Sequence, residues 1–290
     1  MISEFSPNSV KLLNILGEGS FGKVHKARLV ANGVDKFVAV KTWYSKDLDT
    51  VVREAKVLVR MNHPNIVGMI GIVRSRTPRL ILEYLAGGSL LEDLENYANN
   101  RKQRAVWAYG IAKGMRYLHH ELRPYRRHQD LAARNCLLAA DRTTIKLADI
   151  GVWDAGYQNH YFAPDSGNYM YDRDGDYFNR PAPVRWMAPE CVPYNSDPLF
   201  TRKNDVWAYG VVLFEIWTGG ELPFEDIAND QVLRAVYFGT NPVCYRGGID
   251  APGHVQNLMD DCMAQDKDDR PNFKVIVDHW ETFGRRVMQG

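Results

Sequence analysis

The 290-residue sequence lacks most features that would indicate secretion, membrane insertion or nucleic-acid binding. Its four cysteines lie far apart without a CxxC pair, which argues against a zinc site and against a disulfide framework. Its 36 basic and 35 acidic residues nearly cancel, so no nucleic-acid partner is expected. The longest nearly apolar run, from Val206 to Phe214, is too short to cross a bilayer, and the first residues do not resemble a signal peptide. We therefore expect reduced thiols, a cytoplasmic location and no membrane segment in this chain.

The amino-acid composition is typical of a soluble globular protein. Hydrophobic residues make up 45% of the chain and charged residues 24%, so a packed core can form. The length is sufficient for one large core or for two moderate lobes. Residues 153–183, rich in Tyr, Asp, Gly and Pro, are expected to form a mobile loop.

A glycine segment at residues 17–24, GEGSFGKV, contains G-x-G-x-x-G. Dinucleotide-binding folds use the same glycines, but they need a helix directly afterwards. Here polar and apolar residues alternate over 24–30, the hairpin dipeptide Asn32-Gly33 follows, and a β-branched run covers 37–41. This order predicts strand, glycine turn, strand, turn, strand, and favours a glycine flap over a nucleotide.

The run at 37–41 ends in Lys41, and residues 47–61 have the periodicity of an amphipathic helix. Glu54 falls on the apolar stripe of that helix, three residues after Val51 and four before Leu58. A carboxylate on an apolar face costs several kcal/mol unless it is paired, and Lys41 is the expected partner. The alternative is that Glu54 lies at the helix edge and reaches water.

Further motifs follow in the second half of the chain. His128-Gln129-Asp130 is followed five residues after the aspartate by Asn135, and a short strand at 145–148 ends in Asp149-Ile150-Gly151. Before these motifs, Ser89 and Glu92 predict a capping box, and residues 104–120 predict a core helix. After them come Ala188-Pro189-Glu190, a helix from Asp205 that is apolar on all sides, and Arg270.

Taken in order, these motifs resemble a protein kinase domain from about residue 10 to residue 284. The resemblance implies an α+β, two-lobed protein kinase fold. The smaller lobe, residues 1–85, would hold an antiparallel β-sheet and one helix. The larger, mainly helical lobe would be residues 86–290, and the two together would form one kinase domain.

The catalytic-loop sequence at 130–135, DLAARN, resembles the tyrosine kinases. Serine/threonine kinases generally have Lys two residues after the catalytic aspartate, where this chain has Ala132. The segment 183–190, PVRWMAPE, also resembles the tyrosine-kinase segment that docks a phenolic ring. Together with the sequence DVWAYG at 205–210, these two segments favour the receptor-type branch.

The resemblance implies a role for each matching residue. The ATP site would be formed by Gly17, Gly19, Gly22, Val24, Ala39, Lys41, Glu83 and Leu85. The residues that act in catalysis would be Asp130, Arg134, Lys41 and Glu54. Asp130 would accept the proton of the tyrosine hydroxyl, and Arg134 would lie beside that hydroxyl. Asn135 and Asp149 would bind Mg²⁺, with Mn²⁺ as an alternative, because such ions prefer oxygen ligands. A pair between Glu190 and Arg270 would be structural.

The sequence also departs from the family pattern. Gln129 stands where H-R-D has Arg and cannot grip a phosphate as a guanidinium does, and Ile150 replaces the Phe of D-F-G. The loop position nine residues before Pro183 is Asp174, and the nearest tyrosines are Tyr171 and Tyr177. We therefore expect an altered activation switch with an intact catalytic set. Two alternatives are that Arg126 or Arg127 replaces the missing Arg, and that Gln129 is an introduced substitution.

Three functional interpretations follow from these observations. The first is an active protein-tyrosine kinase that uses ATP to phosphorylate tyrosine-containing proteins, with dimerisation for trans-phosphorylation. The second is a pseudokinase that binds ATP or a partner and acts as a signalling scaffold, and the third is a non-kinase nucleotide-binding protein. The domain could belong to a cytosolic kinase or to the intracellular part of a membrane receptor.

Overall fold

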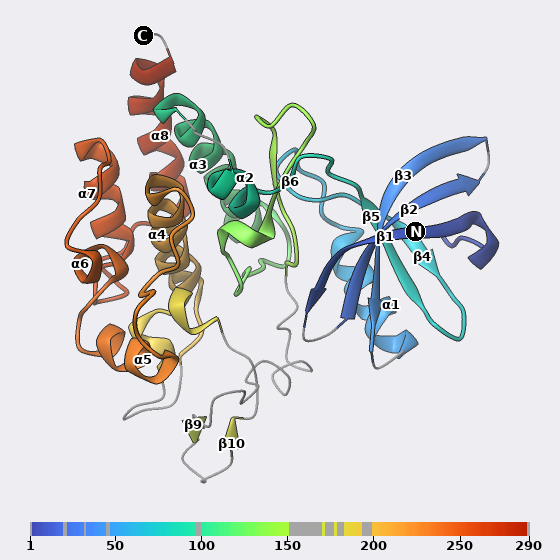
Figure 1. Ribbon diagram of the computed structural model, residues 1–290, viewed down its shortest axis with the longest axis horizontal. Helices are drawn as coiled ribbons and strands as arrows, with labels where there is room; N and C mark the ends of the chain where they lie inside the picture. Colours follow the sequence, from blue (N-terminus) through green and yellow to red (C-terminus); the bar gives the residue numbers. More distant parts are fainter. Residues whose placement is uncertain are drawn as a thin grey trace. The chain divides into compact units, whose positions relative to one another are not determined.

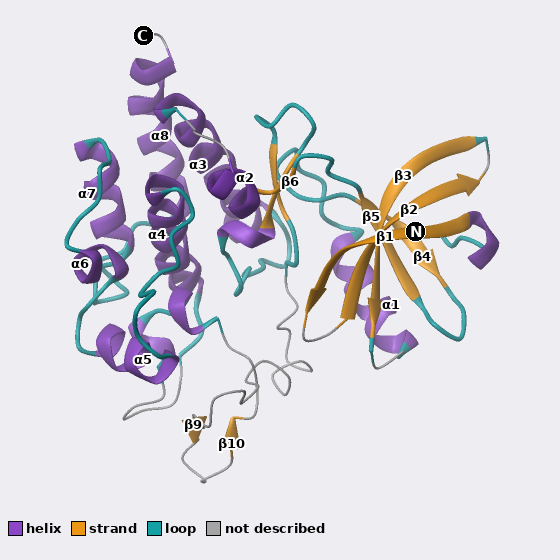
Figure 2. Ribbon diagram, in the orientation of Figure 1, coloured by secondary structure: helices purple, strands orange, loops and turns teal. Residues whose placement is uncertain are grey.

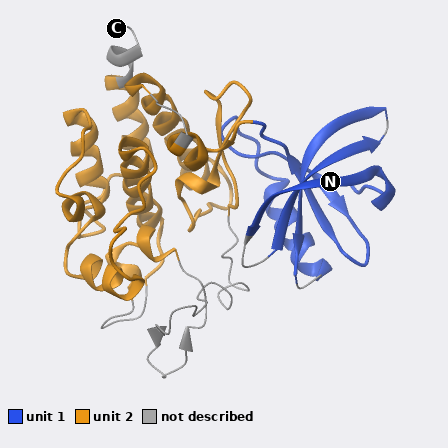
Figure 3. Cartoon of the chain, in the orientation of Figure 1, with its two compact units in different colours: residues 1–86 blue, residues 87–290 orange. Residues whose placement is uncertain are grey.

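The structure, a computed structural model, describes residues 2–19, 22–31, 33–44, 47–96, 100–150, 170–171, 177–178, 183–192 and 199–288 (Figure 1). The chain divides into two compact units, Met1–Ala86 and Gly87–Gly290 (Figure 3). The sequence-based boundary falls one residue earlier, after residue 85.

The first unit is built on a five-stranded antiparallel sheet with strand order β1-β2-β3-β5-β4. Its elements are the 3-10 turn η1 (Pro7–Ser9), β1 (Val10–Gly19), β2 (Gly22–Ala31), β3 (Val34–Trp43), α1 (Leu48–Leu58), β4 (Met69–Val73) and β5 (Arg79–Glu83). This arrangement confirms the predicted small sheet lobe with one helix.

The β2–β3 hairpin forms where the sequence predicts it. Ala31 pairs with Val34, and Gly33 before Val34 adopts a φ of 76°. Glycine reaches this left-handed conformation without steric cost. Behind the hairpin, Val38 and Val40 are fully buried, together with Ala27 and Leu29 from β2.

Helix α1 begins after Asp47, whose side chain accepts hydrogen bonds from the backbone N–H groups of Asp49 and Thr50. Such a cap satisfies donors that the first helical turn leaves free. Val51 is completely buried and Leu58 nearly so, which confirms the apolar stripe. The helix ends at Leu58, three residues before the predicted end.

The N-terminal segment adds a further pairing at the edge of the sheet. Phe5 N–H donates to the carbonyl of Ile72 at 2.9 Å, and Ile72 N–H donates to Ser3 at 2.9 Å. Glu4 pairs with Arg74 at 2.8 Å. Because β4 is the last strand of the sheet, these contacts cover part of an otherwise unpaired edge.

The second unit is mainly helical (Figure 2). Its helices are α2 (Leu90–Asn96), α3 (Arg101–Arg116), α4 (Arg202–Thr218), α5 (Asn229–Tyr237), α6 (Pro242–Arg246), α7 (Gly253–Cys262) and α8 (Phe273–Met288). A small antiparallel sheet joins β6 (Gly88–Ser89), β7 (Cys136–Leu138) and β8 (Ile145–Leu147). Short turns are the π-helical η2 (Tyr117–Glu121) and the 3-10 turns η3 (Ala133–Asn135), η4 (Val184–Trp186) and η5 (Pro189–Cys191). A separate pair is β9 (Met170–Tyr171) with β10 (Tyr177–Phe178).

Helix α4 lies among the other helices of this unit (Figure 1) and is buried from Asp205 to Trp217, as its all-round apolar pattern predicts. Its Tyr209 hydroxyl donates to the Ala108 carbonyl on α3 at 3.0 Å and accepts from the Trp280 indole on α8 at 2.7 Å. These bonds satisfy polar groups inside the core.

The predicted capping box of the second unit is confirmed, and the predicted helix over 104–120 is present in a modified form. Ser89 and Glu92 form the reciprocal capping bonds, at 3.0 and 3.2 Å. The predicted helix over 104–120 is not uniform, because α3 ends at Arg116 and continues as a π-helical turn in which Leu122 N–H donates to Tyr117. Among the described residues, no helix is long and apolar enough to span a membrane.

Candidate active site

Lys41 and Glu54 form the predicted ion pair within the first unit. Lys41 Nζ lies 3.2 Å from Glu54 Oε1, and the two side chains are only 11% and 10% exposed. The Lys41 ammonium also lies 5.3 Å from the ring centroid of Trp43, a cation–π contact. The alternative that Glu54 reaches water is therefore wrong. The role of this pair towards phosphate stays a prediction.

The glycine segment joins β1 to β2, as expected for a flap rather than a dinucleotide fold. Gly17 pairs with Val24 and Gly19 with Gly22, while Ser20 and Phe21 lie outside the described residues. A Cβ at Gly22 would collide with the backbone oxygen of Thr42 on β3. Glycine at this position thus lets β2 approach β3 closely.

Two of the predicted adenine-binding residues lie where β5 ends, Glu83 as its last residue and Leu85 two residues further on. Ala39 on β3 pairs with Leu82 on β5, directly before Glu83. The backbone N–H of Glu83 donates to Gly68 at 2.8 Å, and the Glu83 carboxylate accepts from Gly68 N–H at 3.0 Å. The N–H of Glu83 is therefore engaged within the protein, and Leu85 is buried.

In the second unit, Asp205 of α4 binds the backbone of the predicted catalytic loop. Its carboxylate accepts hydrogen bonds from the backbone N–H of His128 and of Gln129, both at 2.8 Å, and contacts His119 Nε2 at 2.7 Å. Burial opposes ionisation of Asp205, but these donors outweigh it and lower its pKa. Gln129 has a φ of 68°, a strained conformation that these bonds stabilise.

Asp130 lies at the centre of a compact hydrogen-bond network. Arg134 Nη2 donates to its Oδ1 at 2.5 Å, and Asn135 Nδ2 donates to its Oδ2 at 2.9 Å and to its backbone oxygen at 2.7 Å. Burial raises the pKa of the Asp130 carboxyl, although Arg134 and His128 act in the opposite direction. A carboxylate with a raised pKa is a better proton acceptor than a free one.

Asn135 and Asp149 are brought close by the β7–β8 pairing. Cys136, next to Asn135, pairs with Leu147, and the Ala148 N–H donates to the Asn135 carbonyl at 2.9 Å. Asp149 follows directly, is exposed, and has a φ of 54°. Within the described residues, no group of three or more His, Cys, Asp or Glu side chains is arranged to hold a metal.

A further residue, Glu215, was missed by the sequence-based assignment. Its Oε2 accepts from the Ala133 N–H at 2.9 Å and from the Trp186 indole at 3.0 Å, so it joins the catalytic loop to the segment 183–190. Arg134 lies 4.4 Å over the Trp186 ring. Burial raises the pKa of Glu215 to about 7. The available signal was that Glu215 interrupts the apolar sequence that follows Asp205 in α4.

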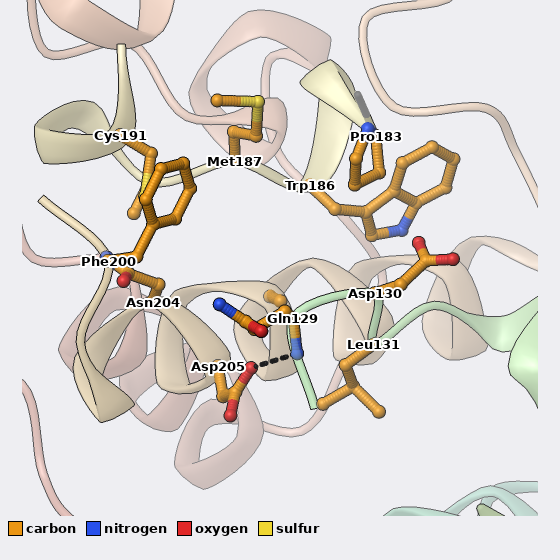
Figure 4. Close-up of a pocket in the computed structure, with 12 residues that line it drawn as sticks. Gln129, Asp130, Leu131, Pro183, Trp186, Met187, Cys191, Phe200, Asn204 and Asp205 are labelled. Atoms are coloured by element: carbon orange, nitrogen blue, oxygen red, sulfur yellow. Dashed lines mark hydrogen bonds between the residues drawn. The ribbon is translucent and has the colours of Figure 1, made fainter. Parts of the chain in front are cut away.

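A pocket lies between the catalytic loop, the segment 183–190 and the start of α4 (Figure 4). Its lining is Gln129, Asp130, Leu131, Pro183, Trp186, Met187, Ala188, Cys191, Phe200, Asn204, Asp205 and Ala208. Figure 4 shows the Gln129 carboxamide directed into this space, at the position where the family pattern has Arg.

Three further features named from the sequence lie within the described residues. Arg270 forms two bonds with the Glu190 carboxylate, at 2.7 and 2.8 Å, which confirms the structural pair. Ile150 is buried, at 2% exposed. Arg127 donates to the Phe200 carbonyl.

Much of the loop expected at 153–183, including Asp174, lies outside the described residues, as does Gly151. The part that is described places Tyr171 opposite Tyr177 in the β9–β10 pair.

Comparison with known proteins agrees with this geometry. Residues 10–280 match the model of the family described as protein tyrosine and serine/threonine kinase, and the chain belongs to this family. It is 32% identical to ephrin type-B receptor 1 of Gallus gallus and 33% identical to the proto-oncogene tyrosine-protein kinase ROS of Homo sapiens. It is 30% identical to the tyrosine-protein kinase Btk of Drosophila melanogaster.

These matches cover 94%, 96% and 95% of this chain, but only 27%, 12% and 33% of the respective relatives. The chain therefore corresponds to a minor part of each of these proteins. The predicted resemblance to tyrosine kinases, receptor kinases among them, is confirmed.

Proposed function

We propose that this chain is a catalytic domain that transfers the γ-phosphate of ATP to tyrosine hydroxyls of proteins. The observation that carries the proposal is the Asp130 network. One carboxylate of raised pKa is fixed by Arg134 and Asn135 beside the indole of Trp186. A flat aromatic residue and a guanidinium next to a proton acceptor suit a phenolic substrate.

The first unit would bind ATP. The glycine segment would cover the phosphates, and Lys41, oriented by Glu54, would contact the α- and β-phosphates. Val24, Ala39 and Leu85 would surround the adenine. Because the Glu83 N–H already donates to Gly68, the adenine contact at this residue would involve its carbonyl.

The donor set in the second unit fits Mg²⁺. Asn135 directs its amide nitrogen to Asp130, which turns its carbonyl oxygen away from that carboxylate. This oxygen and the Asp149 carboxylate are the hard ligands that Mg²⁺ prefers, and they would also accept Mn²⁺. When bound, the ion would supply charge neutralisation for the phosphates.

In the transfer step, the tyrosine oxygen would form a bond to the γ-phosphorus as the bond to the ADP oxygen breaks. The phenolic proton would pass to Asp130. Each Asp130 oxygen accepts one bond from Arg134 or Asn135 and so keeps capacity for the substrate hydroxyl. Arg134 would stabilise the charge that develops beside this carboxylate.

The first test is transfer of labelled phosphate from Mg·ATP to a Glu/Tyr copolymer, with a serine peptide as the control substrate. Asp130→Asn preserves the shape of the side chain but removes the proton acceptor. We expect tyrosine-only labelling by the wild type and a loss of about 10²–10⁴-fold in the variant, the usual contribution of general-base catalysis.

Equal melting temperatures of the two proteins would show that the variant is folded. ATP binding without labelling above the Asp130→Asn background would contradict the proposal and favour a pseudokinase that acts as a scaffold. Fractionation of cells that produce the protein would test whether the domain is cytosolic or the intracellular part of a receptor. The dependence of autophosphorylation rate on protein concentration would test whether dimerisation supports trans-phosphorylation.

A further inference from the structure

Two histidines from different helices face each other in the second unit, remote in sequence from the proposed active site. His254 is the second residue of α7 and His279 lies in the middle of α8 (Figure 1). His254 Nδ1 and His279 Nε2 are 3.4 Å apart. Neither helix contributes a residue to the proposed ATP or substrate sites.

Aromatic neighbours fix both imidazole rings. His254 stacks on Phe283, with ring centroids 5.1 Å apart and an interplanar angle of 11°. His279 lies 4.9 Å from the same Phe283 ring, and Trp280 contacts both imidazoles edge-on at 6.1 and 5.8 Å. Because the rings are held by packing, their convergence does not depend on a bond between them.

The separation of the two nitrogens is informative about what the pair can bind. It exceeds the usual 2.7–3.2 Å of an N–H hydrogen bond, so a direct bond between the rings is weak. Two nitrogens that bind one Zn²⁺ at about 2.0–2.1 Å on neighbouring corners of a tetrahedron lie about 3.3–3.4 Å apart. The observed distance matches that tetrahedral edge.

The surroundings also suit a cation that binds neutral imidazole. Both histidines are only half-buried, so an ion can reach them. Burial lowers the pKa of each, and on His279 the neighbouring His254 adds to this effect while Asp261 opposes it. Metal binding requires the neutral form of histidine.

We propose that His254 and His279 bind one divalent transition-metal ion of the nitrogen-preferring kind, with Zn²⁺ as the reference ion, and thereby connect α7 to α8. No third His, Cys, Asp or Glu ligand is grouped with them among the described residues, so water would complete the coordination. Such a site discriminates against Mg²⁺, which prefers oxygen ligands. The site is independent of the proposed kinase activity.

The test uses the whole chain freed of metal by a chelator. Titration with ZnCl₂ in excess Mg²⁺, followed by calorimetry, should show one saturable equivalent. Each of His254→Ala and His279→Ala should weaken binding at least about tenfold, the smaller loss seen even for outer-shell partners of metal ligands. His25→Ala, which removes a histidine of β2 in the other unit, is the matched control and should leave the titration unchanged.

A second measurement avoids the variants. Nitrogen-15 spectra of the wild-type imidazoles should show Zn²⁺-dependent shifts at His254 Nδ1 and His279 Nε2 together. The melting temperature should also rise as the free Zn²⁺ concentration is increased above its dissociation constant, because only the native state brings the two imidazoles together. Absence of a saturable equivalent, persistence of binding in the double variant, or shifts at other histidines would each overturn the proposal.

Discussion

At the scale of single residues, Glu215 shows how burial sets the ionisation of one group. The two hydrogen bonds to its carboxylate come from neutral donors, the Ala133 amide and the Trp186 indole. Neutral donors offset only part of the desolvation of a buried charge. Its pKa is consequently raised to about 7, so this acid changes charge near neutral pH.

The stability of the chain should therefore depend on pH through Glu215. Between its unfolded pKa and its folded value of about 7, the native state holds more protons than the unfolded state. The free energy of unfolding must then fall as pH rises through this interval, by about 3 kcal/mol for a shift of this size. Glu215→Gln, which keeps an acceptor oxygen but cannot ionise, should remove this part of the dependence.

Urea unfolding of both proteins at pH 5, 6, 7 and 8 would measure the effect. We expect the variant to gain stability relative to the wild type as pH increases, with the largest gain above pH 7. Glu95→Gln, at an exposed position of α2, controls for removal of a negative charge. A stability difference between Glu215→Gln and wild type that is the same at every pH would show that Glu215 does not titrate in this range.

At the scale of elements, the N-terminal segment depends on a glycine in β4. A Cβ at Gly71 would collide with the Ser3 backbone oxygen and would lie 2.6 Å from the Phe5 ring. Both Ser3 and Phe5 are bonded to the neighbouring Ile72. Any side chain at Gly71 must therefore displace the segment that covers the sheet edge.

Gly71→Ala should release residues 2–5 from β4 and destabilise the chain by about 1–3 kcal/mol, the usual cost of overpacking. Hydrogen exchange should detect the release as lost protection at the Phe5 and Ile72 amides. Gly253→Ala is a suitable control, because a Cβ there has no neighbour within 4 Å. Full protection of both amides in Gly71→Ala would contradict the assignment.

The features that could be predicted from the sequence and those that could not differ in how far apart their contacting residues lie along the chain. Local patterns reveal structures whose residues lie close together in the sequence. Examples are the β2–β3 hairpin, the apolar stripe of α1 and the Ser89–Glu92 cap. The pairing of Ser3 and Phe5 with Ile72 and the contact of Glu215 with Ala133 join distant segments. No local periodicity encodes such contacts, and the Lys41–Glu54 pair was predictable only because an acid on an apolar stripe needs a partner.

At the scale of the whole molecule, the predicted ATP-binding residues and the Lys41–Glu54 pair lie in the first unit, and the other predicted catalytic and metal-binding residues lie in the second. All of these residues are present, whereas Gln129 and Ile150 depart from the family pattern. We propose that the change at Gln129 affects regulation rather than transfer. The Gln129 backbone N–H donates a hydrogen bond to Asp205. The Gln129 side chain faces the pocket and is directed away from the Asp130 carboxylate (Figure 4).

An arginine at this position could bind a phosphorylated tyrosine through two parallel bonds, whereas the Gln129 carboxamide carries no charge to attract one. Phosphorylation of the loop should then contribute little to the activity of this chain. Tyr171→Phe combined with Tyr177→Phe should leave turnover of the Glu/Tyr copolymer within a few-fold of the wild-type value. In a protein that carries Gln129→Arg, the same double change should lower turnover, because the restored guanidinium should make turnover depend on these tyrosines.

Initial rates would be compared for the wild type, the double tyrosine variant, Gln129→Arg alone, and Gln129→Arg combined with the double tyrosine change. Each protein would be assayed with and without prior incubation with Mg·ATP, which allows loop phosphorylation. We expect prior incubation to increase the rate only in Gln129→Arg with both tyrosines present. Because Gln129 is fixed through its backbone, the substitution should leave the Asp205 bonds and the melting temperature unchanged. A loss of about a hundredfold or more in the Tyr171→Phe, Tyr177→Phe protein would show that loop phosphorylation still controls activity through another cation, for which Arg126 and Arg127 are the nearest candidates.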